Sequence, residues 1–278
     1  MSDECTRPAA PKGGGEGAAR RTGPRRVILH YHLFKNAGTS LDAVLKRNFP
    51  GRWRTAEFPP QGGDNSDLLS EWIASEPEAA VFSTHTGVGP VPAPDGVEVF
   101  PVVFLREPLS RIHSAYRFER TQGADTPGSR LAREHDFEGY LRERLATTDR
   151  QCRDFQTGRL AAFQPGRGDE MERALRALRT LPFVGIVERF EASLRRLADA
   201  LPEALKLVDL EVEHANRGEG RDGPSAAERA LLLAANRRDA LLYAIALQAH
   251  EAGLPVGTPR LRARDLPAAG VPASGAAS

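Results

Sequence analysis

The stretch from Arg26 to Leu45 constrains the fold of this 278-residue chain more than any other. Its apolar run from Val27 to Leu29 is typical of a strand that is buried on both faces. A polar loop follows, and Leu41 and Val44 then recur at helical spacing. The pattern predicts a strand, a loop and a helix in direct succession.

The loop between strand and helix has the chemistry of an anion site. Gly38 precedes Thr39 and Ser40, so free backbone N–H groups, the positive end of a helix dipole and two hydroxyl groups converge on one point. Lys35 adds a positive charge at the entrance of the loop. These features favour a phosphate site. A simple helix cap at Thr39 or Ser40 beside a solvated Lys35 is the competing interpretation.

The order of the loop residues argues against a nucleotide triphosphate loop, in which the lysine follows the glycines. Here Lys35 precedes Gly38, and the segment from His32 to Ser40 reads H-L-F-K-N-A-G-T-S. It resembles the 5′-phosphosulfate loop of sulfotransferases in the branch of the heparan sulfate 2-O and 6-O enzymes, commonly H-x-P-K-T-x-G-T-S. Phe34 and Asn36 replace the usual proline and threonine.

A second segment resembles the 3′-phosphate motif of the same family. From Phe104 to Tyr116 the chain reads F-L-R-E-P-L-S-R-I-H-S-A-Y, against the usual F-L-R-D-P-x-x-R-x-x-S-x-Y. Arg106 and Ser114 hold the positions of the motif's arginine and serine, and a forked guanidinium with a hydroxyl suits a terminal phosphate. Taken singly, an Arg106 neutralised by Glu107 and a solvated Ser114 are the competing interpretation.

The resemblance implies the sulfuryl donor 3′-phosphoadenosine 5′-phosphosulfate and no metal. The transfer is an in-line displacement onto a hydroxyl acceptor, a saccharide or another small hydroxylated metabolite, with Lys35 supporting the leaving oxygens. The implied donor-binding residues are those of the loop and of the second motif: Lys35, Asn36, Ala37, Gly38, Thr39, Ser40, Arg106 and Ser114.

His85 is the predicted general base for the acceptor hydroxyl. It follows the apolar run from Ala79 to Phe82, and ligands of open parallel sheets sit beyond the carboxyl ends of strands. An imidazole suits this proton transfer. His30, His32 and His113 are competing bases, although a packed or capped imidazole is the commoner outcome for the two in or after the first strand.

Weaker resemblances extend the likeness from Arg26 to about His250, through the segments 154–161, 183–194 and 236–243. The family likeness implies an α/β fold with three αβα layers and a central, mostly parallel sheet, similar to the P-loop NTPases. Residues 26–252 are the predicted domain. Residues 1–25 and 253–278 are rich in Gly, Ala, Pro and Arg without periodicity, which predicts disordered tails.

Caps and apolar runs predict the remaining elements. A strand is expected from Val97 to Leu105, with a helix opened by Pro108 after it. Asp136 and Asp169 are predicted helix caps, and Ser225 with Glu228 is a capping box that opens one long helix to about Ile245. Helices are also predicted from Asp64 or Ser66 and from Cys152 to Phe163, a strand from Phe183 to Val187, and loops at 50–63 and 121–133.

Charge, cysteine content and apolar run length argue against several classes of function. A formal net charge of +1 argues against a whole surface that binds nucleic acid. Cys5 and Cys152 have no metal-ligand spacing around them, so neither a disulfide framework nor a zinc site is expected. No apolar stretch has the length of a membrane span and no apolar signal core precedes Val27, which predicts a cytoplasmic protein. The oligomeric state is not indicated.

Two other functions stay open at this stage. One is a P-loop kinase or NTPase, which would require magnesium. The other is a non-catalytic module that binds a nucleotide or a sulfated glycan, which the departures at Phe34 and Asn36 allow.

Overall fold

The computed structural model describes residues 23–59, 63–212 and 224–254. The predicted tails lie outside these residues except for 23–25 and 253–254. The described strands are β1 Arg25–Tyr31, β2 Trp53–Thr55, β3 Val81–Thr84, β4 Val97–Leu105 and β5 Val184–Ile186. The α-helices are α1 Gly38–Asn48, α2 Ser66–Ser75, α3 Pro108–Thr121, α4 Pro127–Glu134, α5 Phe137–Ala146, α6 Phe155–Ala161, α7 Glu170–Thr180, α8 Phe190–Ala200, α9 Ala226–Ala235 and α10 Arg237–Glu251.

The five strands form one parallel sheet in the order β2-β3-β1-β4-β5. The chain leaves β1 toward β2 and β3 on one side, and leaves β4 toward β5 on the other. The sheet order therefore reverses between the neighbouring strands β1 and β4, and such switch points are where open α/β sheets bind ligands. Tyr31 lies opposite Val103, so the segments that follow β1 and β4 emerge side by side.

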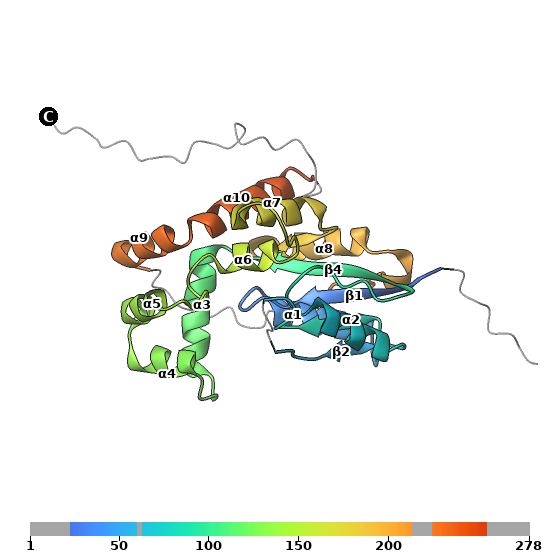
Figure 1. Cartoon of the computed structure of the whole chain (residues 1–278), viewed down its shortest axis with the longest axis horizontal. Coiled ribbons are helices and arrows are strands. Elements are labelled where there is room, and N and C mark those ends of the chain that lie inside the picture. The colour runs from blue at the N-terminus through green and yellow to red at the C-terminus, as the bar shows by residue number, and fades with distance from the viewer. Residues whose placement is uncertain (1–22, 60–62, 213–223, 255–278) are drawn as a thin grey trace, which may run out of the picture.

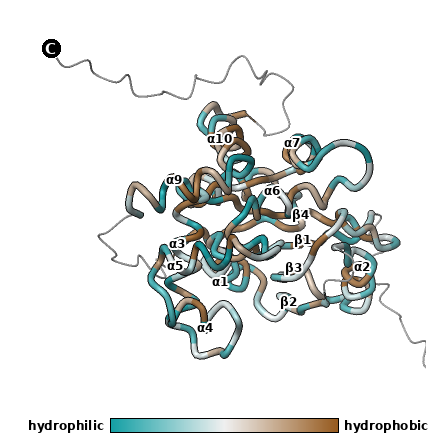
Figure 2. The backbone as a smooth tube through the Cα atoms, turned by 60° about the vertical axis from the view of Figure 1, so that its left-hand side comes forward, coloured by the Kyte–Doolittle hydropathy of each residue, from teal (hydrophilic) through white to brown (hydrophobic). Residues whose placement is uncertain are grey.

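Helices cover both faces of the sheet (Figure 1). The alternation of side chains along β1 sends Ile28 to one face, where α1 and α8 pack, and Leu29 to the other, where α2, α6, α7 and α10 pack. The predicted three-layer αβα architecture with a parallel sheet is confirmed. In Figure 2 the hydrophobic colour gathers along the central strands and is mixed with hydrophilic colour along the outer helices.

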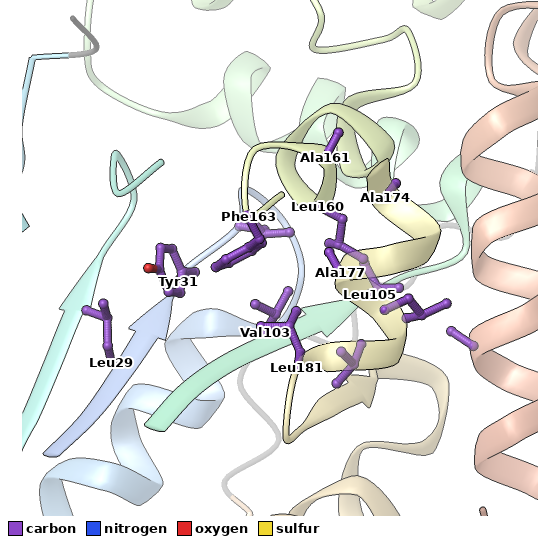
Figure 3. Packing of buried hydrophobic residues seen from close by; sticks show 14 of the residues in the cluster. Leu29, Tyr31, Val103, Leu105, Leu160, Ala161, Phe163, Ala174, Ala177 and Leu181 are labelled. Atoms are coloured by element: carbon purple, nitrogen blue, oxygen red, sulfur yellow. The ribbon is translucent and has the colours of Figure 1, made fainter. Parts of the chain in front are cut away.

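The larger core cluster joins β1 and β4 to α6 and α7 (Figure 3). Tyr31 at the end of β1 packs edge-on against Phe163, with ring centroids 4.7 Å apart. Val103 and Leu105 of β4 lie beneath Leu160 of α6 in the same buried cluster. This packing fixes the ends of β1 and β4, which carry the predicted site, to one helical layer.

A separate apolar cluster holds α3, α4, α5 and α9 together beside the sheet (Figure 1). Tyr140 of α5 is fully buried in it and donates a hydrogen bond to Glu119 of α3 at 2.7 Å. Arg144 donates to the same carboxylate at 2.7 and 2.8 Å. These contacts brace α3, the helix that follows Arg106.

Most of the predicted elements are confirmed, and four are corrected. The 50–63 segment contains the edge strand β2, and the 121–133 segment contains most of α4. The helix predicted for 152–163 is shorter, because α6 spans only Phe155–Ala161. The long C-terminal helix is two helices that break at Asn236, whose φ of −127° is not helical.

No helix within the described ranges has both the length and the apolar character needed to cross a membrane.

Candidate functional site

The loop after β1 presents a run of free backbone donors. Helix α1 begins at Gly38, and the preceding residue, Ala37, adopts a left-handed conformation with φ of 59°. Within the described part of the chain, no acceptor bonds the backbone N–H groups of Ala37, Gly38, Thr39 and Ser40. Four free N–H groups at a helix N-terminus form an anion-binding concavity.

The competing interpretation of a simple helix cap does not fit this loop. Thr39 and Ser40 are the second and third residues of α1, and the helix has no side-chain cap hydrogen bond. Lys35 and Ala37 both have left-handed backbones, with φ of 64° and 59°. Such strain in residues other than glycine is characteristic of functional loops.

Lys35 is not a freely solvated lysine. Its Nζ lies 4.4 Å from the ring centroid of Phe118 on α3, and Phe34 meets the same ring edge-on at 5.6 Å. Burial, followed by repulsion from the positive charge of Arg106, lowers the pKa of Lys35. Phe34, which replaces the usual proline of the family loop, thus helps to hold the aromatic surface on which the ammonium rests.

Arg106, directly after β4, meets this loop. Its Nη1 donates a hydrogen bond to the carbonyl of Lys35 at 3.0 Å. Glu107 instead accepts from the backbone N–H groups of Leu109 and Ser110 and so caps α3, and no ion pair joins it to Arg106 in the described segments. Burial lowers the pKa of Arg106, and its Nε is buried without a partner among the described residues. Such a guanidinium suits an anionic ligand.

Gln156 of α6 forms hydrogen bonds with both the loop and Arg106. Its Oε1 accepts from the backbone N–H of Arg106 and from Nδ2 of Asn36, both at 2.8 Å, and its Nε2 donates to the carbonyl of Arg106 at 2.8 Å. Asn36 is buried, also donates to the carbonyl of Phe104, and bonds its own N–H to Leu33. Its side chain therefore anchors the loop from within.

His85 follows β3 and forms a carboxylate–imidazole pair with Glu57. Its Nδ1 lies 2.6 Å from Oε1 of Glu57, and the same carboxylate accepts from the backbone N–H groups of His85 and Thr86. Burial alone would raise the pKa of Glu57, but the hydrogen bonds of His85 and Thr86 lower it. An ionised Glu57 holds the proton of His85 on Nδ1 and leaves Nε2 available as a base.

A second carboxylate, Asp42 of α1, joins two histidines. Its Oδ1 lies 2.8 Å from Nδ1 of His30, and its Oδ2 lies 3.1 Å from Nδ1 of His32. Burial would raise the pKa of Asp42, but the charges and hydrogen bonds of both histidines hold it well below its usual range. Asp42 is therefore an ionised acceptor for two imidazole N–H groups.

His32 bridges the loop and His85. Its ring centroid lies 3.9 Å from that of His85. A Cβ placed on Gly38 would stand 2.0 Å from Cδ2 and 2.1 Å from Nε2 of His32. The imidazole therefore occupies the space in which a side chain at this position would lie. Any side chain at residue 38 would displace His32.

The donor atoms of His30, His32 and Asp42 lie within 4.8 Å of one another, close enough to surround one metal ion. However, each imidazole faces its own carboxylate oxygen at hydrogen-bond distance. Nδ1 of His30 also lies 3.1 Å from Oγ of Ser83. This is the geometry of a hydrogen-bonded chain.

Ser114 and His113 lie further along α3. Ser114 is one helical turn before Phe118, so both share a face, and Phe118 contacts Phe34 and Lys35 of the loop. Ser114 therefore stands on the face of α3 that meets the loop. His113 instead packs edge-on against Phe137 of α5 at 5.0 Å, where burial lowers its pKa.

The structure therefore joins Lys35, the N-terminus of α1, Arg106 and His85 at the carboxyl ends of β1, β4 and β3. Sequence reasoning missed Glu57 and Asp42 as partners of the histidines, and it assigned no role to Gln156. Asp42 carries a faint signal, because it lies one helical turn after Gly38. The family resemblance also implies a segment near the donor at His214, Asn216 and Arg217, and these residues are outside the described ranges.

No family model matches the chain. The chain is 37% identical over 189 residues to an archaeal protein from Archaeoglobus fulgidus that is described as uncharacterized. The match covers 64% of this chain and 74% of the archaeal protein.

Proposed function

We propose that this chain is a sulfotransferase. The chain belongs to the same family as the archaeal protein that is described as uncharacterized. The reaction moves a sulfuryl group from 3′-phosphoadenosine 5′-phosphosulfate to a hydroxyl acceptor. Because the relative's description names no activity, the support comes from the motifs and the site of this chain alone.

One contact carries the proposal: Arg106 donates to the carbonyl of Lys35 at 3.0 Å. Two segments that resemble the 5′- and 3′-phosphate motifs of one family are 71 positions apart in the chain, yet they meet at one switch point of the sheet. A single ligand with two anionic ends fits that arrangement. The pairing of β1 with β4 brings the two segments together, and the likeness of both to phosphate motifs of one family is what points to a shared ligand.

The residues present fit this donor. The four free N–H groups from Ala37 to Ser40 and the ammonium of Lys35 receive the phosphosulfate. Arg106, with Nε lacking a partner in the described chain, receives the 3′-phosphate together with Ser114. Both cations have pKa values lowered by burial, so an anionic ligand relieves an existing electrostatic cost.

The transfer is an in-line displacement at sulfur. The acceptor oxygen forms a new S–O bond while the S–O bond to the phosphate breaks, and the electron pair of that bond stays on the phosphate oxygen. Nε2 of His85 takes the acceptor proton, and Glu57 holds the ring in the required tautomer. Lys35 and the helix N-terminus stabilise the charge that builds on the leaving phosphate.

The acceptor is a saccharide or another small hydroxylated metabolite, an assignment that rests on the family likeness alone. Glu57, in the segment after β2, hydrogen-bonds to His85 and therefore lies beside the proposed base.

Thermal melts test the proposal. The product nucleotide, 3′-phosphoadenosine 5′-phosphate, should raise the melting temperature without added metal, because only the folded chain presents both anion sites. ATP with magnesium is the control for a kinase or NTPase. No shift with the product nucleotide, or an equal magnesium-dependent shift with ATP, would contradict the proposal.

A further inference from the structure

We infer that His32 is a second catalytic residue, which donates a hydrogen bond from Nε2 to the transferring sulfuryl group. The inference rests on the proposed function and deepens it. It concerns a side chain that the family likeness presents only as the first residue of the loop motif.

The first observation is the position of the ring. His32 packs on Gly38 at the N-terminus of α1, and its ring centroid lies 3.9 Å from that of His85, with the two rings tilted by 31°. In an in-line displacement the leaving oxygen, the sulfur and the acceptor oxygen lie on one line. The loop holds one end of that line and His85 holds the other. A side chain that contacts both ends flanks the sulfur between them.

The second observation is the direction of the ring. Nδ1 faces Asp42 at 3.1 Å, so the opposite nitrogen is the one left for a ligand. Nε2 and Cδ2 are the ring atoms nearest to the Cβ position of Gly38, which places Nε2 on the side of the anion loop. No described residue makes a hydrogen bond to Nε2 of His32.

The third observation is the charge. A carboxylate only accepts hydrogen bonds, so Nδ1 of His32 carries a proton toward Asp42. Donation from Nε2 requires the imidazolium form, and Asp42, with a side chain only 13% exposed, supplies the counter-charge.

The two carboxylate–imidazole pairs thus have different roles in the transfer. The pair of His85 and Glu57 removes the proton from the acceptor. The pair of His32 and Asp42 stabilises the sulfuryl oxygens as the S–O bonds exchange. His30 shares Asp42, but it is only 1% exposed and lies within β1, so it acts on the position of the carboxylate alone.

The test compares the affinities for donor and product nucleotide by calorimetry without acceptor, beside turnover. In His32→Asn the amide can keep the contact with Asp42 but cannot reach the position of Nε2. We expect it to weaken donor binding about tenfold or more, which is the loss of a charge-assisted hydrogen bond, and product binding less than about twofold. Turnover should fall about a hundredfold.

Three controls sharpen the result. His32→Gln, whose amide nitrogen reaches the position of Nε2, should recover part of the donor affinity and of the rate. His30→Asn alters the same carboxylate and should leave the ratio of the two affinities unchanged. In the wild-type protein, the 15N resonance of Nε2 of His32 should shift more with the donor than with the product, a readout that needs no variant.

The outcomes separate a failure of the proposed function from a failure of the inference about His32. If the wild-type protein binds neither nucleotide, the proposed function itself is wrong. If it binds both and His32→Asn weakens both equally, or neither, His32 has only a structural role. Stoichiometric binding of zinc or manganese that both histidine variants abolish together with turnover would replace the inference with a metal site.

Discussion

At the scale of single residues, Arg106 separates donor binding from chemistry. Its guanidinium is tied to the loop by one hydrogen bond, and on this account it contacts a phosphate remote from the sulfur. Such a contact has nearly the same strength in the ground state and in the transition state, so its loss removes mainly uniform binding.

We therefore expect Arg106→Ala to raise the KM for the donor strongly and to change kcat little. Arg179→Ala, on the exposed face of α7, is the matched control for loss of one positive charge. Initial rates over a range of donor concentrations decide the matter. If saturating donor fails to restore most of the rate, Arg106 does not bind the 3′-phosphate.

At the scale of elements, α6 is the part that joins the loop after β1 to Arg106. Gln156 at its start binds Arg106 and Asn36, and the helix is itself capped from α10. Asp239 accepts from the backbone N–H groups of Gln156 and Thr157 at 3.1 and 2.7 Å, and from the hydroxyl of Thr157 at 2.7 Å. A buried side chain on one helix thus fixes the beginning of another.

Asp239→Ala should destabilise the protein by about 3 kcal/mol, because it leaves two buried N–H groups without an acceptor. Asp239→Asn, which keeps one acceptor oxygen, should cost less. Urea unfolding gives the free energies, and affinity for the product nucleotide should fall in the same order because α6 holds the site. An Asp239→Ala protein as stable as wild type would show that this cap does not hold α6.

The sequence allowed the prediction of β1, β4, α1 and α3, because each combines a continuous apolar run or helical periodicity with a clear boundary. Strand β2 was missed because three partly exposed residues carry no periodic signal. The break between α9 and α10 was missed because Asn236 bonds the carbonyl of Cys152, a contact 84 residues away.

The residues of the candidate site that stand in local sequence motifs could be predicted. The contacts between residues from distant segments could not. Gly38 and Arg106 stand in motifs whose spacing can be read directly. The pairing of His85 with Glu57 joins β3 to the segment after an unrecognised strand, so nothing in the local sequence indicates it. The contact between the rings of His32 and His85 likewise depends on β1 and β3 being neighbours in the sheet.

At the scale of the whole molecule, the parallel sheet brings the parts of the site together. The strand order places β1 between β3 and β4. Three segments with separate chemistry therefore emerge at one edge: the anion loop, the arginine of the second motif and the proposed base. We propose that this edge of the sheet transfers a sulfuryl group and does not only bind a nucleotide.

The most direct test of that claim is turnover of sulfur-35-labelled donor by the full chain, with a pooled set of hydroxylated acceptors and a chelator present. We expect labelled acceptor to form together with one equivalent of 3′-phosphoadenosine 5′-phosphate. His85→Asn should lower this rate about a hundredfold to ten-thousandfold while leaving nucleotide affinity nearly unchanged. Tight binding of the donor with no labelled product from any acceptor would contradict the account, and would identify the chain as a binding module.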